Sequence, residues 1–456
     1  MQNPDIVMES LHSPPKKTNG WPSLRERTLV MIAHGTECYC GAEAKAGNLM
    51  LTWSALIRLM IMPAKNAVAA FAARANRSKQ TRRTFLSVSA GAGLSVLAGG
   101  GMGILAAAGE RRIFSSGRIG NLRLKNRLVR SATSENAFRD GVMTDEGIAI
   151  YRALGQGGAG LIITGNMAAM AGGRYTDLQT CIYDDRFIPS IRRIAEAVHG
   201  ARNGSQVLAQ ITHTAPEGQL ADPIAASAKP RPSWKRPPRA MTTEEVEEMT
   251  GQFAQAVRRA KASGFDGVEI YAAGYLLGSF LSPYTNTRTD RFGGSLENRV
   301  RVIADIVSKA RKLVGGDFPI LAKLNCDDGL EGGTNIDTFP AVAAQVEKAG
   351  VAAIDVIGPV GNLEGESYFL KYAQKLRVKA PVILTGGNRN VDRLEQILQA
   401  GPPDFVAMAR PFIREPDLAV RWQAGKGDPH AECISCNRCL DGFRQGKITR
   451  CRVNEA

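Results

Sequence analysis

Short apolar, often β-branched runs alternate with longer amphipathic stretches from Ile113 onward. Apolar runs of about four to eight residues are typical of buried strands, whereas apolar residues spaced three and four apart indicate a helix with one buried face. The regular alternation of the two predicts successive β-α units around a parallel sheet. Eight runs qualify as strands: Leu128–Ser134, Gly160–Thr164, Gln206–Thr212, Gly267–Tyr271, Ile320–Leu324, Ala353–Ile357, Val382–Thr385 and Phe405–Ala409.

Helical patterns fill the intervals between these strands. The stretch Thr243–Ser263 follows Thr242 and has Glu245 in its first turn, which predicts a capped helix start. The stretch Leu296–Val314 repeats apolar residues three and four apart. Several stretches end at a glycine, as expected where a left-handed residue closes a helix. These glycines are Gly264, Gly315, Gly350 and Gly401.

The number of β-α units determines the fold class that we expect. A (β/α)8 barrel usually has about 250 residues and can exceed 400, so the chain after residue 112 is long enough for one. We therefore predict an α/β fold, a TIM barrel, with Ile113–Lys125 as an N-terminal hairpin across the barrel floor. A doubly wound open sheet is the alternative. In a barrel, the active site lies at the carboxyl ends of the strands.

Small residues and an arginine follow the last two predicted strands. Gly386, Gly387 and Asn388 come after the seventh strand, and Ala409 and Arg410 come after the eighth. Backbone N–H groups can approach an anion where side chains are small, and a guanidinium group can pair with a phosphate. The Gly-Gly pair alone could be a tight turn without a ligand. Together with Arg410 it predicts the phosphate site that is usual in such barrels.

Four motifs carry a resemblance to a known family. They are Ile119–Arg127 (IGNLRLKNR), Gly264–Ile270 (GFDGVEI), Phe280–Pro283 (FLSP) with Asn286 and Arg288 after it, and Asp290–Arg299 (DRFGGSLENR). Over about residues 113–456 the chain resembles the old yellow enzyme family, FMN-dependent barrels that reduce activated double bonds with electrons from NAD(P)H. The resemblance implies that the expected phosphate belongs to FMN and that NAD(P)H is an electron donor.

The resemblance also implies which residues hold the flavin. Thr133 matches the position that hydrogen-bonds the flavin near C4=O, Gln210 matches the amide at the pyrimidine edge, and Lys323 matches the cation beside N1 and C2=O. A positive charge there stabilises the negative charge that reduction leaves at that edge. The phosphate would be held by Gly386, Gly387, Asn388, Ala409 and Arg410.

The substrate side departs from the family pattern. Many members have His-x-x-His or His-x-x-Asn before Gly-Tyr-Leu, whereas this chain has Tyr271 and one residue fewer. Tyr275 keeps its place, and by resemblance it protonates the substrate, since a phenol is a neutral acid at pH 7. Tyr271 is expected to anchor the substrate. Packing beside the flavin is the alternative for both tyrosines. His213 is either a substrate contact or a structural hydrogen-bonding group.

Half of the eight cysteines lie in the last 24 residues, at Cys433, Cys436, Cys439 and Cys451. Three closely spaced thiolates with a remote fourth are typical of an iron-sulfur site. The segment 429–456 resembles the 4Fe-4S segment of the subgroup that contains trimethylamine dehydrogenase and 2,4-dienoyl-CoA reductase. That resemblance implies a cluster that relays electrons to or from the flavin. Structural zinc and two disulfides are the alternatives.

The first 112 residues carry much of the positive charge of the chain. Residues 1–112 hold 14 Lys and Arg against 6 Asp and Glu, whereas the rest holds 44 against 37. The rest of the chain is therefore only mildly basic, and we expect no nucleic-acid binding. Arg82 and Arg83 precede a weakly apolar run that ends in Ala106–Ala108, so residues 81–108 resemble a twin-arginine export signal. A membrane-spanning helix is the alternative.

The position of this signal, far from the N-terminus, favours a true start at Met62 and no stable domain over residues 1–80. The protein would be exported to the periplasm in folded form, or remain cytoplasmic if the signal is not used. Contact with a membrane is expected only through the signal.

The sequence thus predicts an FMN barrel over 109–428 followed by the four-cysteine segment. It would transfer hydride between the flavin and a small unsaturated carbonyl or amine. Since the chain ends soon after the cysteines, we expect another protein to be its electron partner. The alternative is a barrel that binds FMN without turnover and acts in electron relay or maturation.

Overall fold

The computed structural model of the chain describes residues 111–359, 363 and 365–453. The predictions made for residues 1–80 and for the export signal over 81–108 lie outside these residues. None of the helices in the described part is long and apolar enough to cross a membrane.

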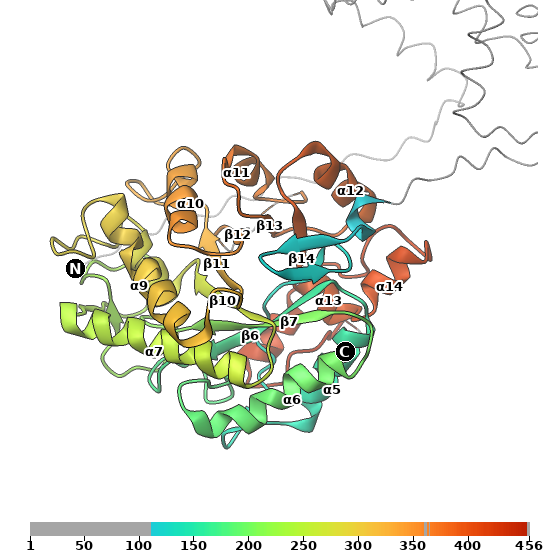
Figure 1. Ribbon diagram of the computed structural model, residues 1–456, viewed down its shortest axis with the longest axis horizontal. Coiled ribbons are helices and arrows are strands. Elements are labelled where there is room, and N and C mark those ends of the chain that lie inside the picture. The colour runs from blue at the N-terminus through green and yellow to red at the C-terminus, as the bar shows by residue number, and fades with distance from the viewer. Residues whose placement is uncertain (1–110, 360–362, 364, 454–456) are drawn as a thin grey trace, which may run out of the picture. The chain divides into compact units, whose positions relative to one another are not determined.

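Eight parallel strands close into a barrel around which the helices lie (Figure 1). Each strand pairs with the next along the chain, and the pairing of Val406 with Leu128 joins the last strand to the first. This closed order confirms the predicted (β/α)8 fold and excludes the open sheet. The strands are β3 (Leu128–Arg130), β6 (Leu161–Ala168), β7 (Gln206–Thr212), β10 (Gly267–Ala272), β11 (Ile320–Asn325), β12 (Ile354–Ile357), β13 (Val382–Thr385) and β14 (Phe405–Met408).

Helices cover the outside of the barrel. The longest, α7, starts with the capping box that the sequence predicted, because Thr242 Oγ1 accepts from Glu245 N while the Glu245 side chain accepts from Thr242 N. The helices are α5 (Asp145–Gln156), α6 (Ile188–His199), α7 (Thr243–Ala262), α8 (Tyr275–Leu281), α9 (Leu296–Val314), α10 (Phe339–Lys348), α11 (Leu370–Lys375), α12 (Val391–Ala400), α13 (Arg410–Arg414), α14 (Leu418–Gln423) and α15 (Arg438–Arg444).

The predicted N-terminal hairpin closes the floor of the barrel. Its two strands, β1 (Gly117–Ile119) and β2 (Leu122–Leu124), pair antiparallel. Ile119 and Leu124 are fully buried and join the inward-facing residues of the barrel in one apolar cluster. The other short elements are η1 (Arg112–Phe114), β4 (Phe138–Arg139), β5 (Val142–Met143), η2 (Asp185–Phe187), β8 (Ile224–Ala225) and β9 (Arg239–Ala240).

The first two barrel strands differ in length from their predictions. β3 ends at Arg130 and not at Ser134, because the Arg130 guanidinium bonds Ile163 O, Thr133 O and Glu135 and thereby folds the chain back after the strand. β6 runs on to Ala168 past a register shift between Ile163 and Asn166. Both changes occur at carboxyl ends of strands, where sequence periodicity gives way to local polar contacts.

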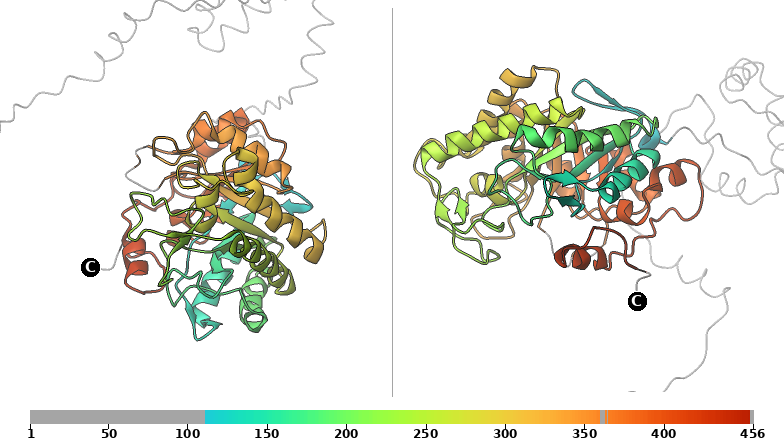
Figure 2. Two further views of the ribbon diagram at one scale, coloured as in Figure 1. Left: turned by 90° about the vertical axis from the view of Figure 1, so that its left-hand side faces the viewer. Right: turned by 90° about the horizontal axis from the view of Figure 1, so that it is seen from below.

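The four-cysteine segment lies beside the carboxyl ends of the strands, outside the barrel (Figure 2, right). Its start is tied to the residues after β13, since Ala431 N donates to Arg389 O. Further along, Asn437 Oδ1 accepts from Arg410, and Thr449 N donates to Glu135 O after β3. The segment therefore borders the end of the barrel at which an active site is expected.

Candidate active site

Polar side chains meet at the barrel mouth because neighbouring strands are in register. Tyr271 on β10 and Asp355 on β12 both lie opposite Lys323 on β11. Glu269 on β10 lies opposite Gln210 on β7. Residues two apart on a strand share a face, so these five side chains point inward above the apolar cluster that fills the floor.

Lys323 is the centre of this group and is 2% exposed. Its Nζ donates to Asp355 Oδ2 and, at 3.1 Å, to Ser131 Oγ, and it lies 3.7 Å from Glu269 Oε1. Gln210 Nε2 donates to Glu269 Oε1 at 2.6 Å. Thr385 Oγ1 donates to Asp355 Oδ1 at 2.7 Å. One buried cation thus faces two buried carboxyl groups.

Burial decides which of these groups is charged. It raises the pKa of Glu269 to about 8, despite the nearby Lys323 ammonium. Burial also opposes the charge of Lys323, but the neighbouring Asp355, and to a smaller extent Glu269, outweigh it and raise the lysine pKa. Lys323 therefore keeps its charge at neutral pH and pairs with Asp355, whereas Glu269 holds a proton. Within the described residues Glu269 Oε2 is buried without a hydrogen-bond partner, so this carboxyl can still bind a ligand.

Tyr271 and Tyr275 lie side by side next to the lysine, with ring centroids 5.4 Å apart. Burial raises the pKa of Tyr271 to about 12 and that of Tyr275 well above its ordinary value. Both phenols keep their protons at neutral pH, the state that their predicted roles require. Tyr275 begins α8 with φ of 52°, a backbone conformation that costs a non-glycine residue about 1–3 kcal/mol. Such strain is typical of functional sites.

His213 and Thr133, which were predicted to contact the substrate and the flavin, lie in different surroundings from the tyrosines. His213 is 2% exposed, and its Nδ1 accepts from Ala215 N at 3.2 Å, so it has the structural bond that was its alternative role. Burial lowers the His213 pKa to about 4, which keeps the ring neutral. Thr133 donates to Ser131 O and lines a cavity on the outer side of β3, whereas Ser131 contacts Lys323.

The predicted phosphate residues form a tight turn above β13 and β14. Gly386 and Gly387 have φ of 120° and 73°, and a Cβ at Gly387 would lie 2.9 Å from Ser367 N, so only glycine fits there. Asn388 donates to Leu384 O and Ala407 O and accepts from Ser367 Oγ. Its side chain therefore fixes the turn and is not available to a ligand.

Arg410 is half-buried and donates to Asn437 of the cysteine segment at 2.7 Å. Ala409 is also half-buried and precedes α13. The two residues lie where the barrel mouth meets the cysteine segment.

The four predicted metal ligands, Cys433, Cys436, Cys439 and Cys451, line one small cavity. All four are free thiols. Burial raises the Cys439 pKa, and the nearby Cys433 and Cys436 raise it further. No three His, Cys, Asp or Glu side chains of the described residues are placed to hold a metal ion. The thiols are thus gathered around one space without forming a closed ligand set.

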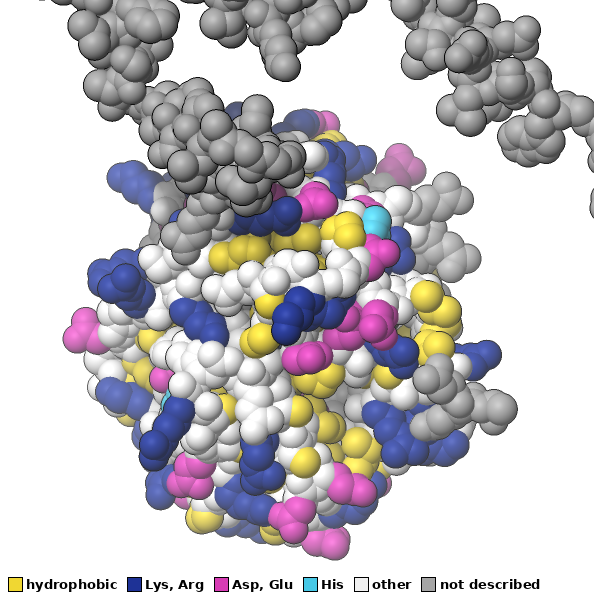
Figure 3. Space-filling view, turned by 90° about the vertical axis from the view of Figure 1, so that its right-hand side faces the viewer, with side chains coloured by type: hydrophobic (Ala, Val, Ile, Leu, Met, Phe, Trp, Pro, Cys, Tyr) yellow, Lys and Arg dark blue, Asp and Glu magenta, His cyan; other side chains and the backbone are white. Residues whose placement is uncertain are grey.

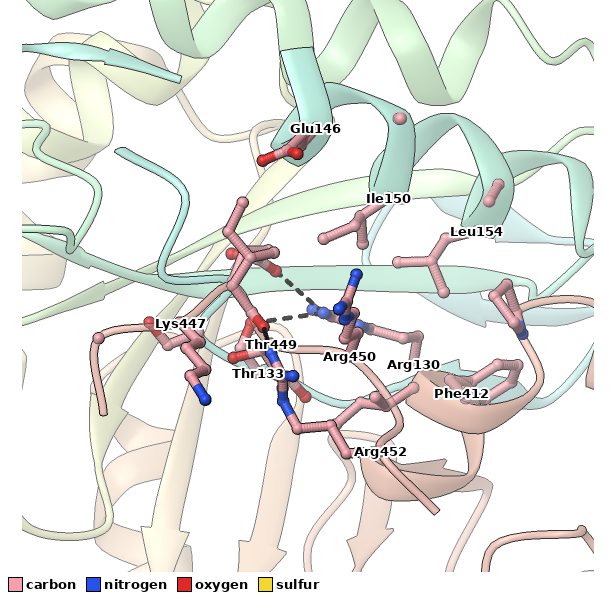
Figure 4. Close-up of a pocket in the computed structure, with 18 of the residues that line it drawn as sticks. Arg130, Thr133, Glu146, Ile150, Leu154, Phe412, Lys447, Thr449, Arg450 and Arg452 are labelled. Carbon is pink, nitrogen blue, oxygen red and sulfur yellow. Dashed lines mark hydrogen bonds and ion pairs between the residues drawn. The ribbon is translucent and has the colours of Figure 1, made fainter. Parts of the chain in front are cut away.

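Two further cavities lie next to these groups. One, of about 210 Å³, is bordered by Tyr275 and by Phe443 of α15. The other, of about 980 Å³, lies between α5, α13 and residues 446–452, and Figure 4 shows Arg450 and Arg452 entering it opposite Ile150 and Leu154. The first cavity is of a size for a small substrate, since about 150 Å³ holds a benzene ring.

Sequence reasoning missed the two carboxyl partners of Lys323. Both were visible as a signal, because Glu269 and Asp355 are single acidic residues inside otherwise apolar strand runs, and a charge there requires a partner. It also missed Asn136 and Phe443, which join the cysteine segment to the barrel. Their contacts bridge more than 300 residues of sequence, so no local pattern indicates them.

The donor set at the mouth fits the pyrimidine edge of a flavin. A buried cation, an amide and a protonated carboxyl with an unused oxygen match the carbonyl and N–H groups of that edge. The glycine turn above β13 packs against Ser367, Tyr368 and Phe369 on the side where a Cβ would lie, so its contact with a phosphate stays a prediction. The donor set agrees with FMN as the cofactor.

Comparison with known proteins agrees with this assignment. The model of the NADH:flavin oxidoreductase / NADH oxidase family matches residues 112–428. A metal reductase of Desulforamulus reducens is 36% identical over 360 residues, which cover 75% of this chain and 53% of that protein. An NADH oxidase of Thermoanaerobacter brockii is 35% identical over 365 residues, 75% of this chain and 56% of that protein.

Among solved structures, a 2-naphthoyl-CoA reductase in complex with 2-naphthoyl-CoA aligns with a TM-score of 0.71 and 28% identity, over 76% of this chain and 57% of that one. The chain thus spans about half the length of these relatives. Fold, site and sequence agree, and the chain therefore belongs to the NADH:flavin oxidoreductase / NADH oxidase family of FMN-dependent oxidoreductases.

Proposed function

We propose that this chain transfers hydride between FMN and a small unsaturated carbonyl compound, with NAD(P)H as an electron donor. The observation that carries the proposal is the buried Lys323, held between Asp355 and Glu269 at the barrel mouth. A positive charge fixed in a low-dielectric site stabilises negative charge far better than it would in water. The name of the NADH oxidase relative supports a nicotinamide as the donor.

FMN, when bound, supplies the hydride chemistry, and the protein positions it. Lys323 and Gln210 would hold the pyrimidine edge, and the protonated Glu269 would donate its Oε2–H to a carbonyl there. Gly386, Gly387, Ala409 and Arg410 would hold the phosphate, with Asn388 fixing the turn. Thr133 would hydrogen-bond the flavin near C4=O, as the family resemblance implies. The hydroxyl group that contacts Lys323 is that of Ser131 and not that of Thr133.

Tyr275 would give a proton to the substrate, because its burial keeps the phenol neutral and its ring borders the small cavity. Tyr271 would anchor the substrate from the lysine side. His213 would contact the substrate only through Nε2, since its Nδ1 accepts a backbone N–H. Its neutral ring then leaves Nε2 as a hydrogen-bond donor.

We propose that the four cysteines hold a 4Fe-4S cluster that passes electrons between the flavin and a protein partner. Their placement around one cavity beside Arg410 supports this. Zinc on the same thiols and disulfides between them are the competing occupants. Basic side chains of Arg139, Lys447, Arg450 and Arg452 line the neighbouring large cavity, which suits an acidic partner.

The first experiment is an ultraviolet-visible spectrum of the full chain purified without oxygen, with iron and sulfide assays on the same sample. A flavin spectrum over a broad absorbance, about four iron atoms per chain and bleaching by NAD(P)H support the proposal. Flavin without iron would restrict the function to NAD(P)H-driven reduction. Bound flavin that NAD(P)H reduces but no enone reoxidises would instead favour a barrel that binds FMN without turnover.

We also propose export by the twin-arginine route. Replacing Arg82 and Arg83 with lysine should retain the protein in the cytoplasm, as measured by cell fractionation against an unexported marker. Equal periplasmic amounts of variant and parent would contradict the proposal. No nucleic-acid partner is proposed, since Lys and Arg lie in separate groups among Asp and Glu on the face shown in Figure 3.

A further inference from the structure

The small cavity beside Tyr275 has walls from two distant parts of the chain. One side consists of Ser134 from the loop after β3, Asn166 of β6, residues from the loop after β6, and Tyr275. The other side is α15 of the cysteine segment, which contributes Leu440, Phe443 and Arg444. A helix that carries Cys439 therefore also borders the proposed substrate site.

Three aromatic rings form a continuous row along this cavity. Tyr175 lies 6.2 Å from Phe443, with planes inclined by 28°, and 6.4 Å from Tyr275. Ring pairs at such separations attract each other by about 0.5–1.5 kcal/mol beyond the effect of burial. The row presents flat apolar surface to whatever enters the cavity, and flat surface favours a planar, conjugated group over a branched one.

The position of Phe443 opposite Tyr175 is fixed by a buried amide. Asn136 is 1% exposed, and its Nδ2 donates to Phe443 O and Lys447 O, both at 3.2 Å. Its Oδ1 accepts from Thr176 Oγ1, next to Tyr175. Gln179 holds the other side of the loop, since its Oε1 accepts from Tyr175 N. These hydrogen bonds therefore fix the positions of Phe443 and Tyr175 relative to each other.

The charge of the cavity separates the two substrate classes that the sequence left open. Arg444 is the one charged residue among those that line the cavity in the described structure, and no carboxylate lines it. Aromatic rings alone could hold an ammonium group through cation–π contacts, but a guanidinium at the rim repels it. Arg444 already pairs with Asp441 at 3.5 Å, but because both side chains are exposed this pair contributes little, and an anion in the cavity can compete for the guanidinium.

We propose that α15 is the outer wall of the substrate cavity and that Phe443 and Arg444 make it selective for a planar, conjugated substrate with an anionic group. The inference rests on the proposed function, because it assigns the substrate class of the same site. The cysteine segment then determines which substrate is accepted, in addition to any part in electron transfer.

The test uses unreactive probes, three phenyl compounds that differ in charge and one acid without a ring, on the full-length flavin-loaded protein. Binding of 3-phenylpropanoate, 3-phenylpropanamide, 3-phenylpropylamine and pentanoate is followed by the change in flavin absorbance. We expect the phenyl acid to bind about threefold tighter than the amide, since an exposed ion pair contributes about 0.2–1 kcal/mol. It should also bind tighter than the amine and than pentanoate. Tightest binding of the amine would overturn the proposal.

Variants assign the effect to residues. Phe443→Ala should weaken binding of all three phenyl probes about tenfold and leave that of pentanoate unchanged, whereas Phe443→Leu should weaken phenyl binding less. Arg444→Gln should remove the advantage of the acid over the amide. Arg118→Gln, on the hairpin at the opposite end of the barrel, is the matched control for charge. Unchanged phenyl binding in Phe443→Ala, with full flavin content, would overturn the proposal.

Failure of the inference and failure of the proposed function give different results. Reduction of the flavin by NAD(P)H, measured without probe, tests the function. Reduction without the expected probe selectivity would overturn the assignment of α15 and leave the function standing. The expected selectivity without NAD(P)H reduction would support the assignment of α15 and reject that donor. If Phe443→Ala does not retain flavin, the ranking of probes by the parent and by Phe443→Leu decides.

Discussion

Replacing Glu269 with glutamine should make the stability of the flavin-free protein less dependent on pH. Glu269 is fully buried, and its pKa is about 8 in the folded chain against an ordinary 4.5. A group whose pKa rises on folding stabilises the folded state fully below its unfolded pKa. This contribution is lost as pH rises through the folded value. The window is therefore about pH 5 to 8.

The size of the effect follows from linkage. Each unit of difference between the folded and unfolded pKa values corresponds to about 1.4 kcal/mol of unfolding free energy. Across pH 5 to 8, this contribution should fall by roughly 3–4 kcal/mol as the folded protein is forced to ionise a buried carboxyl. Glutamine at this position keeps an oxygen for Gln210 Nε2 and has no proton to lose, so the variant should lack this slope.

Urea unfolding of both proteins at several pH values between 5 and 9 measures the difference. Subtracting the curve of the variant from that of the parent cancels other titrating groups. His213 is one of them, because its pKa is lowered to about 4 and it makes stability rise with pH below about 6.5. A difference that changes by less than about 1 kcal/mol over the window would refute the assignment of a proton to Glu269 at neutral pH.

Three further outcomes are expected. Tyr275→Phe should slow reduction of 2-cyclohexenone about tenfold or more while NAD(P)H reduces the flavin as before; an equal enone rate would reject the proton-donor role. Cys439→Ser should lose iron but keep flavin, with Cys181→Ser as the buried-thiol control; full iron content would remove Cys439 from the ligand set. Arg130→Met should lower the unfolding free energy by about 3–5 kcal/mol, because it strands the buried Glu135 that Arg130 contacts at 2.9 Å; a loss below about 1 kcal/mol in urea unfolding would contradict this.

Local pattern was enough to predict the frame of the barrel. The predicted limits of Gln206–Thr212, Val382–Thr385 and Leu296–Val314 are those observed, because apolar runs, caps and closing glycines act within a few residues. The hairpin that closes the floor was also predicted from its neighbourhood in sequence. Lys323 was assigned by resemblance, and it lies on β11 opposite Tyr271 and Asp355.

The local sequence pattern could not predict contacts that depend on strand register or that join segments distant in sequence. Lys323 meets Asp355 and Glu269 only because three strands align, and a shift of one residue would turn a side chain to the other face. Asn388 was expected in the phosphate set, yet its amide holds backbone carbonyls of β13 and β14. Phe443 contacts Tyr175 because α15 packs against a segment that is distant in sequence. The residues around Phe443 and around Tyr175 carry no pattern that indicates this contact.

The closed floor has a consequence for the order of assembly. Ile119 and Leu124 fill the bottom of the barrel, so any ligand that reaches Lys323 enters from the mouth. The cysteine segment borders that same opening through Arg410 and Asn136. A flavin that arrives after the segment has docked would have to pass it, whereas one that arrives earlier finds the barrel open. Flavin binding and docking of the cysteine segment therefore use the same end of the barrel, so the order of the two events decides whether the flavin meets an open mouth or one that the segment already borders.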